Sequence, residues 1–369
     1  ILGDYERSEQ LYSQALDTLE TALGDNHPHI ALTLNNMALL YYYQQDYARA
    51  ELPARRALAI QHLSFDSNHP DIANSEVALA RILLEKRTYE EAQKLLETAL
   101  ASQRLALGED HPRVAFTLNN LAKLHKARGD SLASAAGRLH EYDLAKPLYY
   151  RALTIAISAG QPEVLWRIQL GLSQLFDARN NPNAAIFYGY DAVATLQELR
   201  KAVSVLDKEL QQSFLQERYQ VYRHLADLLI SQGYIPEAQH VLGMLKQAEY
   251  FDFVRRSADE PGAEPGIDLK DVAIFSTYFK FRDDLVSTGK DKAELDQTID
   301  LSQKDTKRLE ESRQILADAQ NDFLEYLSTF EKMLEELRSR PPQLTLSEDK
   351  AISLMGLVRE LGPGWVMIH

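Results

Sequence analysis

The sequence has no cysteine among its 369 residues, and this absence removes disulfides, thiolate metal ligands and cysteine nucleophiles together. No apolar run approaches the roughly 18 residues of a membrane-spanning helix, so we expect no membrane contact. The opening residues do not resemble a signal peptide. A cytoplasmic location is the default expectation for such a chain.

The short motifs of catalysis and cofactor binding are missing as well. The sequence has no glycine-rich phosphate loop, no Gly-x-Ser-x-Gly turn and no His-Glu-x-x-His segment. Adjacent carboxylates such as Glu90 and Glu91 fall on the surfaces of predicted helices, where they are solvated charge. We therefore expect no catalytic residues, no cofactor and no metal site in this chain.

Basic residues are in deficit, because 40 lysines and arginines stand against 54 acidic residues and give a net charge of −14. A chain of this charge repels phosphate backbones, so we expect no nucleic-acid partner. A local stripe of basic side chains remains open at this level.

What the sequence does contain is a repeat with a period of 42 residues. The repeated features are an Asn/Asp-His-Pro tripeptide, a tyrosine and an Ala-Leu pair. The tripeptides are 26–28, 68–70 and 110–112, the tyrosines are Tyr5, Tyr47 and Tyr89, and the pairs begin at Ala15, Ala57 and Ala99. A period of roughly 20 to 50 residues is typical of a solenoid, in which each copy packs on its neighbours. Function is then expected on a continuous concave surface.

Each unit is predicted to be two helices joined by a turn. The Asn or Asp before each His-Pro is expected to cap the first helix, and proline in the first turn has no amide to leave unpaired. Behind this start, Ile30, Leu34, Met37, Ala38 and Tyr41 form one apolar stripe. The second helix carries small residues that let two helices approach closely. We therefore expect an all-α, right-handed helix-turn-helix solenoid with a C-terminal helical extension.

Three departures from the repeat are visible. Residues 131–141 are an insertion, because Tyr142 and the pair that begins at Ala152 arrive late in the fourth unit. Pro53 stands inside a predicted second helix, where proline costs roughly 3 kcal/mol, so that helix is expected to kink or to start late. The second unit has Val77 and Ala78 where its neighbours have two asparagines.

The units resemble tetratricopeptide repeats in the 42-residue form typical of kinesin light chain. The resemblance is carried by the His-Pro start, the Leu-Asn-Asn-apolar-Ala segments at 34–38 and 118–122, Tyr41, and the aromatic residue at the turn. It is strong to about residue 158 and weaker to about residue 256. The resemblance implies a protein-binding solenoid over residues 1–256, with the first helix of each unit lining a concave groove.

The helix stripe turned away from the packing stripe identifies the candidate binding residues. An asparagine there can pair with a peptide backbone, since an amide both donates and accepts hydrogen bonds. Arg81, Lys123 and Lys126 would give the groove a positive floor, which predicts an acidic or carboxylate-bearing peptide ligand. The candidate residues are Asn35, Asn36, Leu39, Tyr42, Asn74, Arg81, Asn119, Asn120, Lys123 and Lys126. In the alternative interpretation, the lysines are solvated surface and the asparagines pack between units.

The recurrent His27, His69 and His111 are not expected to bind metal. They stand one unit apart, at about 10 Å in stacked helices, whereas zinc ligands lie about 2 Å from one point. We interpret them as structural residues at helix starts.

The second half of the chain carries a different signal. Residues 207–210, 222–229, 233–234, 237–239 and 249–256 resemble the segment that joins tetratricopeptide repeats to the caspase-like protease domain of CHAT proteins. A Pro/Gly-rich loop at 257–266 is expected to end the solenoid. A long amphipathic helix is predicted from about residue 304 to 338. Its apolar stripe is Leu309, Leu316, Phe323, Leu327, Phe330, Leu334 and Leu337.

Residues 257–369 are therefore expected to be a helical extension that leads towards a missing C-terminal domain. The sequence also opens in the second half of a unit, so we expect a fragment of a longer protein. The resemblance implies the regulatory or sensor arm of a CHAT-type protease without its enzyme. Two alternatives remain, namely a free-standing adaptor like kinesin light chain and a scaffold in which residues 304–338 self-associate.

Overall fold

The computed structural model describes residues 5–203, 208–254, 275–296 and 303–336. These residues form thirteen α-helices and no strand, which confirms the expected all-α fold. The helices are α1 (Tyr5–Leu23), α2 (Pro28–Tyr43), α3 (Tyr47–Ser64), α4 (Pro70–Glu85), α5 (Tyr89–Leu107), α6 (Pro112–Ser131), α7 (Ala135–Ser158), α8 (Pro162–Ala178), α9 (Pro182–Val203), α10 (Lys208–Ser231), α11 (Ile235–Val254), α12 (Ser276–Asp296) and α13 (Gln303–Glu336).

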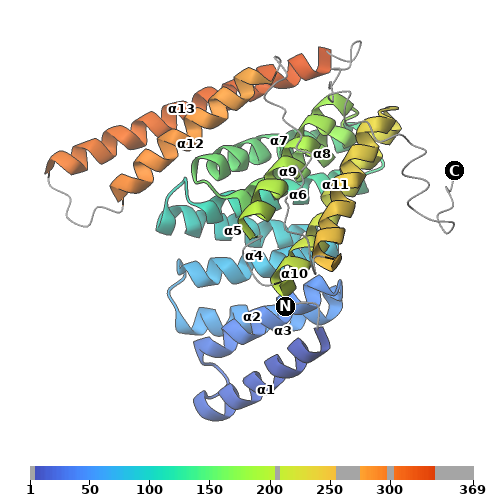
Figure 1. Ribbon diagram of the computed structural model, residues 1–369. Helices are drawn as coiled ribbons and strands as arrows, with labels where there is room; N and C mark the ends of the chain where they lie inside the picture. The colour runs from blue at the N-terminus through green and yellow to red at the C-terminus, as the bar shows by residue number, and fades with distance from the viewer. Residues whose placement is uncertain (1–4, 204–207, 255–274, 297–302, 337–369) are drawn as a thin grey trace, which may run out of the picture.

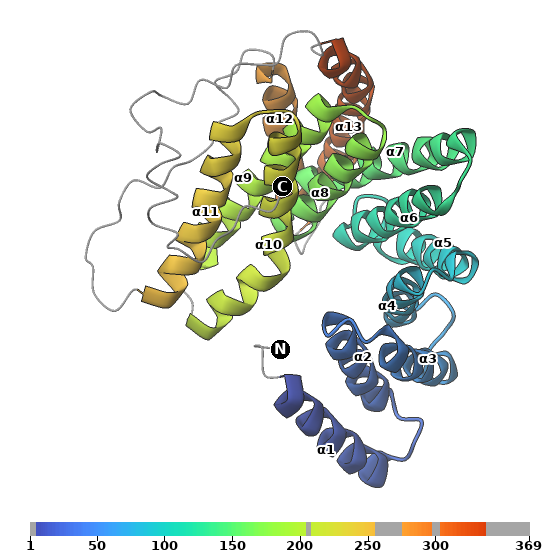
Figure 2. The ribbon, with the colours of Figure 1, turned by 90° about the vertical axis from the view of Figure 1, so that its right-hand side faces the viewer.

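Consecutive helices pack in pairs, and the pairs stack into a curved array (Figure 1). We call α2, α4, α6 and α8 the inner helices, because each contacts the next along one side of the array. We call α3, α5, α7 and α9 the outer helices, because each packs against the inner helix before it. Figure 2 shows α2, α4 and α6 on one side and α3, α5 and α7 on the other.

The core follows the seams between helix pairs. The outer helices contribute small side chains to it, and Ala50, Ala54, Ala57, Ala92 and Ala99 are all fully buried. Small residues allow the helices to pack closely, and larger side chains from the inner helices fill the remaining space. This is the stacked arrangement that the 42-residue period predicts.

Three of the inner helices, α2, α4 and α6, begin with a histidine cap. The Nδ1 atoms of His27, His69 and His111 accept hydrogen bonds from the backbone amide two residues later, at 3.2, 3.2 and 3.1 Å. A proline follows each histidine at the first helical position. The prediction that the preceding Asn or Asp is the cap is therefore wrong by one residue. An unprotonated imidazole nitrogen can fill this acceptor role as well as a carboxylate or amide oxygen.

Pro53 lies inside α3, which nevertheless begins at Tyr47 and runs to Ser64. The expected late start is therefore wrong. Asp46 explains the early start, since its Oδ1 accepts a hydrogen bond from the Arg49 backbone amide at 3.0 Å and caps the helix before the proline.

The insertion at 131–141 lengthens two helices and adds little loop. α6 continues to Ser131 and α7 starts at Ala135, so only three residues between them are not helical. His125 and Arg128 of α6 both contact the carboxylate of Glu141 in α7, at 2.9 Å each. The insertion thus extends the third helix pair at the C-terminal end of α6.

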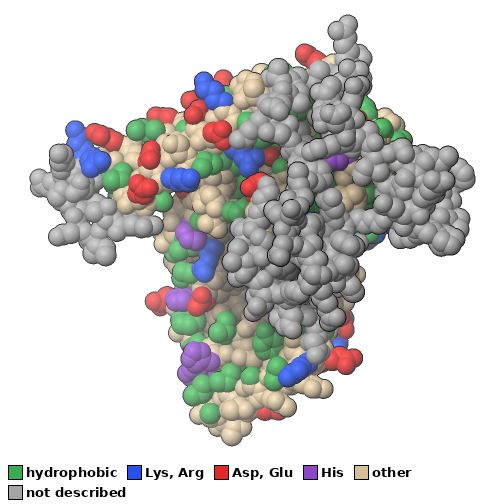
Figure 3. Space-filling model, viewed as in Figure 1, with side chains coloured by type: hydrophobic (Ala, Val, Ile, Leu, Met, Phe, Trp, Pro, Cys, Tyr) green, Lys and Arg blue, Asp and Glu red, His purple; other side chains and the backbone are tan. Residues whose placement is uncertain are grey.

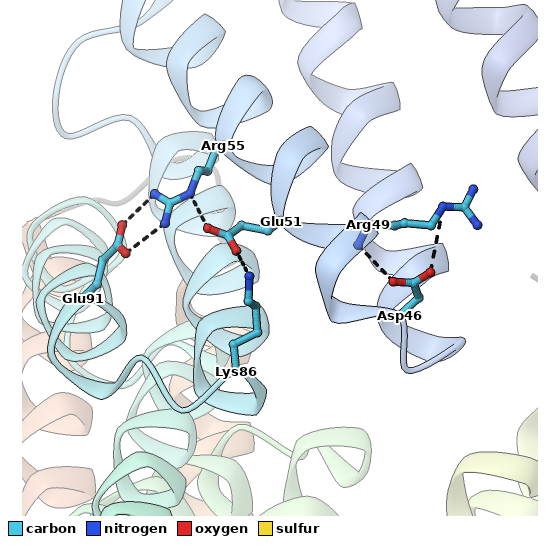
Figure 4. A network of polar contacts seen from close by, with 6 residues as sticks. All are labelled: Asp46, Arg49, Glu51, Arg55, Lys86 and Glu91. Atoms are coloured by element: carbon cyan, nitrogen blue, oxygen red, sulfur yellow. Dashed lines mark hydrogen bonds and ion pairs between the residues drawn. The ribbon is translucent and has the colours of Figure 1, made fainter.

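Charged side chains also join neighbouring pairs on the surface (Figure 4). Arg55 of α3 forms an ion pair with Glu51 of its own helix at 2.7 Å and a two-pronged contact with Glu91 of α5 at 2.6 and 2.9 Å. Lys86, at the end of α4, pairs with Glu51. The network connects three helices of adjacent units.

The C-terminal helices α12 and α13 form a long hairpin that packs across the outer helices α7 and α9 (Figure 1). Among the described members of the predicted apolar stripe, Phe323, Leu327, Phe330 and Leu334 are buried in this contact. The stripe proposed for self-association is therefore covered within the chain. Leu337 lies outside the described residues.

Candidate peptide groove on the inner helices

An open groove of about 560 Å³ crosses the inner helices α2, α4 and α6. Its walls come from α2, α4 and the N-terminal part of α6, and the C-terminal ends of α3 and α5 contribute to its rim. The volume lies within the range of about 300 to 1,000 Å³ that is usual for ligand sites.

Five of the ten predicted binding residues line this groove. They are Asn35, Asn36, Leu39, Asn74 and Arg81. All five side chains are partly exposed. Asn35 also holds the neighbouring unit, because its Nδ2 donates a hydrogen bond to Ser75 Oγ at 2.6 Å. These five residues of the predicted helix stripe thus lie together in the structure. Ligand binding by them stays a prediction.

Asn119 and Asn120 do not line the groove, and the structure corrects their expected exposure. Asn119 has 0% of its surface exposed, and Asn120 is buried with its Nδ2 donating to the Phe116 carbonyl at 2.8 Å. Asn119 lies four residues after Ala115 and three before Ala122, which places it on the same helix stripe as two fully buried alanines. These asparagines therefore serve packing, as the alternative interpretation had it.

Arg81 is held in the groove by two aromatic rings. Its guanidinium carbon lies 4.4 Å from the centre of the Tyr42 ring and 5.7 Å from that of Phe116. Tyr42 is fixed in turn, since its hydroxyl donates to Glu85 Oε1 at 3.3 Å. Burial raises the pKa of Tyr42 despite the nearby Arg81 charge, so the phenol stays neutral. Among the described residues, no carboxylate forms an ion pair with Arg81.

The two predicted lysines lie outside the groove lining. Lys123 occupies the position of Arg81 one unit later, is partly buried and has its own polar or electrostatic contacts. Lys126 forms an ion pair with Asp130 of the same helix at 2.8 Å. The expected positive floor is therefore narrower than the sequence suggested.

Several groove residues escaped the sequence analysis. Leu32 and Phe116 line the groove and stand in the same register as Asn74, one unit to either side. The period itself could have identified these two. Gln61 and Phe65 reach the groove from the end of α3, and no helical stripe of the inner helices predicts a residue from an outer helix.

The charges in the groove lining are few. Arg81 and Arg113 are positive and Asp71 is negative, so these three side chains give the lining a net positive charge. Arg113 is exposed and belongs to the first turn of α6. Elsewhere, acidic and basic side chains are interspersed on the described surface visible in Figure 3. The groove is thus a local positive site on a chain whose net charge is −14.

A buried carboxyl group lies on α4 near the groove. Glu76 is 4% exposed, and its Oε2 has no hydrogen-bond partner among the described residues. Burial raises its pKa to about 7. The equivalent residues of the adjoining units are Leu34 and Leu118, both buried, so Glu76 occupies a position that the repeat fills with an apolar side chain.

Two further classes of site are absent from the described residues. No group of three or more His, Asp or Glu side chains gathers there in a way that could hold a metal ion. In the same residues, no helix combines the length and the apolar character needed to cross a bilayer.

The stacked helix pairs and the groove on their inner helices define a helical-repeat binding module. Residues 1–61 and 71–134 match the tetratricopeptide repeat family. This region therefore consists of tetratricopeptide repeats, a unit that generally binds protein partners. No curated protein is significantly similar to the chain in sequence.

Solved structures with similar folds include BtubC (BKLC) from P. vanneervenii, at 18% identity and a TM-score of 0.49, over 72% of this chain and 98% of that one. The nearly identical TPR-like repeats of a Podosopora anserina protein named for kinesin light chain share 21% identity at a TM-score of 0.41, over 63% of this chain and 99% of that one. A substituted form of the same repeats gives 21% identity and a TM-score of 0.43, over 54% and 90% of the two chains.

Proposed function

We propose that the groove on α2, α4 and α6 binds a short peptide segment of a partner protein through a carboxylate that pairs with Arg81. The observation that carries this proposal is the state of Arg81. Its guanidinium is positioned by Tyr42 and Phe116, lines the groove, and has no ion-pair partner among the described residues. Arginine on an aromatic face can present its forked donors to a planar carboxylate.

The dimensions of the groove favour an extended peptide. It spans three neighbouring inner helices, and packed helices lie about 8 to 10 Å apart, so its length is about 16 to 20 Å. An extended chain advances about 3.3 Å per residue, which corresponds to about five or six residues. Asn36 and Asn74 supply amide groups along this path, where they can pair with peptide bonds.

The positive lining supports an acidic ligand. Asp71 is the acidic side chain of the lining and lies in the first turn of α4, ten residues before Arg81 on the same helix. A ligand carboxylate at Arg81 therefore meets one unpaired cation without displacing a carboxylate of the protein. The apolar walls at Leu39 and Phe116 add contact area for the peptide's other side chains.

Peptide arrays of acidic, neutral and basic segments test this function. The parent protein is expected to bind the acidic peptides. Arg81→Gln is expected to weaken that binding about tenfold or more, because a charge-assisted hydrogen bond contributes roughly 1.5 to 3 kcal/mol. Lys126→Gln is the matched control, since Lys126 lies outside the lining and is already paired with Asp130. Equal binding by the parent and by Arg81→Gln would exclude Arg81 as the recognition residue.

We infer further that this module is the regulatory arm of a CHAT-type caspase-like protease in the cytoplasm. The support is the resemblance of residues 207–256 to the segment that precedes such protease domains. The alternative is a free-standing adaptor of the kinesin light chain kind. The reading frame after His369 separates them, because a downstream region with the His and Cys of a protease dyad favours the regulatory arm, and a stop codon or an unrelated domain contradicts it.

A further inference from the structure

The hairpin of α12 and α13 is attached to the repeats by an aromatic cluster and by polar contacts. The ring of Phe187 on α9 meets Phe275, Tyr278 and Phe330 at centre distances of 4.7 to 4.9 Å. Near the C-terminal end of α13, Asn183 Nδ2 of α9 donates a hydrogen bond to the Leu334 carbonyl at 3.0 Å. The surface of α7 and α9 that the hairpin contacts is called the hairpin seat.

One buried carboxylate forms the first polar attachment. Asp191 of α9 is fully buried and accepts hydrogen bonds from Tyr278 at 3.1 Å and from Arg282 at 2.7 Å, both on α12. It also accepts from Gln169 of the inner helix α8 at 2.6 Å. A continuous polar path thus leads from an inner helix to the hairpin.

A second polar path leads from α13 to the start of α6. Gln320 of α13 accepts a hydrogen bond from Arg151 of α7 at 2.9 Å. The other terminal nitrogen of Arg151 contacts Asp110 Oδ1 at 3.4 Å. Asp110 immediately precedes His111, which caps α6. Arg151 therefore connects the hairpin to the residue before the cap.

The start of α6 is also a wall of the groove. The backbone amide of Arg113 donates to His111 Nδ1, and the Arg113 side chain lines the groove. Lys292 of α12 acts on the same turn, because burial first, and then the charges of Arg113 and Lys292, lower the pKa of His111. Two helices of the hairpin thus influence one turn of the groove.

The hairpin seat has one point of closest approach. Gly289 of α12 lies against the backbone of Ser158, where a Cβ atom would meet the Ser158 carbonyl oxygen at 1.8 Å. No larger residue fits there unless α12 moves away from α7. A single methyl group therefore offers a way to lift the hairpin without removing any polar contact by design.

From these contacts we propose that the α12–α13 hairpin is a conformational regulator of the groove. Its docking on α7 and α9 holds the first turn of α6 in place through Gln320, Arg151 and Asp110, and its release loosens the wall that carries Arg113. The proposed coupling is between hairpin docking and the shape of the groove. An effect of this coupling on ligand recognition rests on the proposed peptide function. A domain that follows the hairpin in a longer chain could then change the groove by pulling on the hairpin.

Hydrogen–deuterium exchange tests the coupling in the Gly289→Ala variant. The amides of 113–115 all hydrogen-bond to His111, and we expect them to exchange about tenfold faster once the hairpin lifts, which corresponds to ~1.4 kcal/mol. The amides of 71–73 bond in the same way to His69, which has no contact with the hairpin among the described residues, and should not change. Gly243→Ala is the matched control, since a Cβ at Gly243 meets nothing within 4 Å.

A cycle of Asp110→Ala, Gln320→Ala and the double variant tests the route. The two side chains contact Arg151 and not each other, so coupling through Arg151 predicts that the double variant exchanges at 113–115 no faster than the faster single variant. Unchanged exchange at 113–115 in Gly289→Ala, with α12 and α13 clearly faster, overturns the proposal. So does an equal acceleration at 71–73, or independent, multiplying effects in the cycle.

The exchange and peptide-binding experiments distinguish failure of the hairpin coupling from failure of the proposed peptide function. Accelerated exchange at 113–115 together with a failed peptide array leaves the coupling in place and removes the proposed ligand. Peptide binding that is lost in Arg81→Gln but equal in Gly289→Ala and the parent supports the ligand and removes the regulatory role. If Gly289→Ala does not fold, Lys146→Glu releases the Glu331 contact of α13 instead, and the double exchange with Glu331→Lys should restore slow amide exchange.

Discussion

The first three helix pairs and the hairpin seat are held together in different ways. In the pairs, equivalent residues 42 positions apart make equivalent contacts, as the caps of His27, His69 and His111 show. At the hairpin seat each contact occurs once and joins distant parts of the chain, such as Lys146 and Glu331. The helix pairs are held by local contacts that recur in each unit, whereas the hairpin is held by long-range contacts that each occur once.

This difference predicts how each region responds to damage. The stability of a repeat array is the sum of contributions from its units and their nearest-neighbour interfaces. The loss of one of several equivalent contacts therefore removes only a small part of it. The hairpin seat has no second copy of its buried carboxylate. Single substitutions should therefore have their largest effects at the seat and their smallest effects on the surface of the repeats.

The largest effect is expected for Asp191→Ala. Removal of this carboxylate leaves Arg282 and Tyr278 without their shared partner in a buried position. Breaking a buried ion pair from one side costs about 3 to 5 kcal/mol. Denaturant unfolding should show that loss, and Asp284→Ala on the exposed face of α12 should stay within about 0.5 kcal/mol of the parent. A loss below about 1 kcal/mol for Asp191→Ala would mean that the buried carboxylate contributes little to the attachment of the hairpin.

Glu76→Leu should stabilise the chain and sharpen the comparison from the other side. Glu76 stands where the neighbouring units have a leucine, Leu34 or Leu118. It is buried, and its Oε2 has no hydrogen-bond partner among the described residues. A pKa raised from 4.5 to about 7 corresponds to about 3 kcal/mol of lost stability once the carboxyl is ionised. The substitution should recover most of this at pH 8.

The sign of the pH effect follows from proton binding. Between pH 4.5 and about 7 the folded chain holds a proton on Glu76 that the unfolded chain has released, so stability falls as pH rises through this window. Unfolding measured at pH 5 and at pH 8 should show this fall in the parent and in the exposed control Glu90→Leu, and should not show it in Glu76→Leu. A fall of equal size in Glu76→Leu would assign the effect to another group.

The repeats were predictable because their information is local and copied. The His-Pro starts and the Ala-Leu pairs predict the helix pairs and the 42-residue step. The hairpin seat was not predictable in this way. Nothing in the spacing of Asp191, Tyr278 and Arg282 marks them as partners, since a buried polar contact formed once leaves no period in the sequence.

The groove shows the same division. The helix stripe placed Asn36 and Arg81 correctly on the lining, because rotation along a helix follows from residue number. It failed for Asn119, which is fully buried on the same helix stripe as Ala115 and Ala122. It also missed Phe65, because the reach of an outer helix depends on where that helix ends.

A smaller effect is expected at the histidine caps. Burial and two nearby positive charges lower the pKa of His111, so the unfolded chain takes up a proton at a higher pH than the folded one. Stability is then complete above pH 6.5, the ordinary value, and is lost as pH falls through the lower folded pKa. His111→Ala should cost about 1 kcal/mol at pH 8, the usual value of a cap. His111→Asn keeps a cap without a titrating group, so its unfolding should depend less on pH between 4 and 6.5; an unchanged acid dependence would contradict the cap as its source.

The smallest effect is expected where the ion pairs are most numerous. Arg55 contacts both Glu51 and Glu91, yet its side chain is 42% exposed, and exposed pairs contribute little because water and salt screen them. Arg55→Gln should therefore cost less than about 1 kcal/mol, and the difference from the parent should shrink further as salt is raised from 0.05 to about 1 M. A cost comparable to that of Asp191→Ala, or one that persists in high salt, would show that this network joins the repeats as firmly as the buried carboxylate joins the hairpin. The distinction between shared local contacts and a single long-range attachment would then fail.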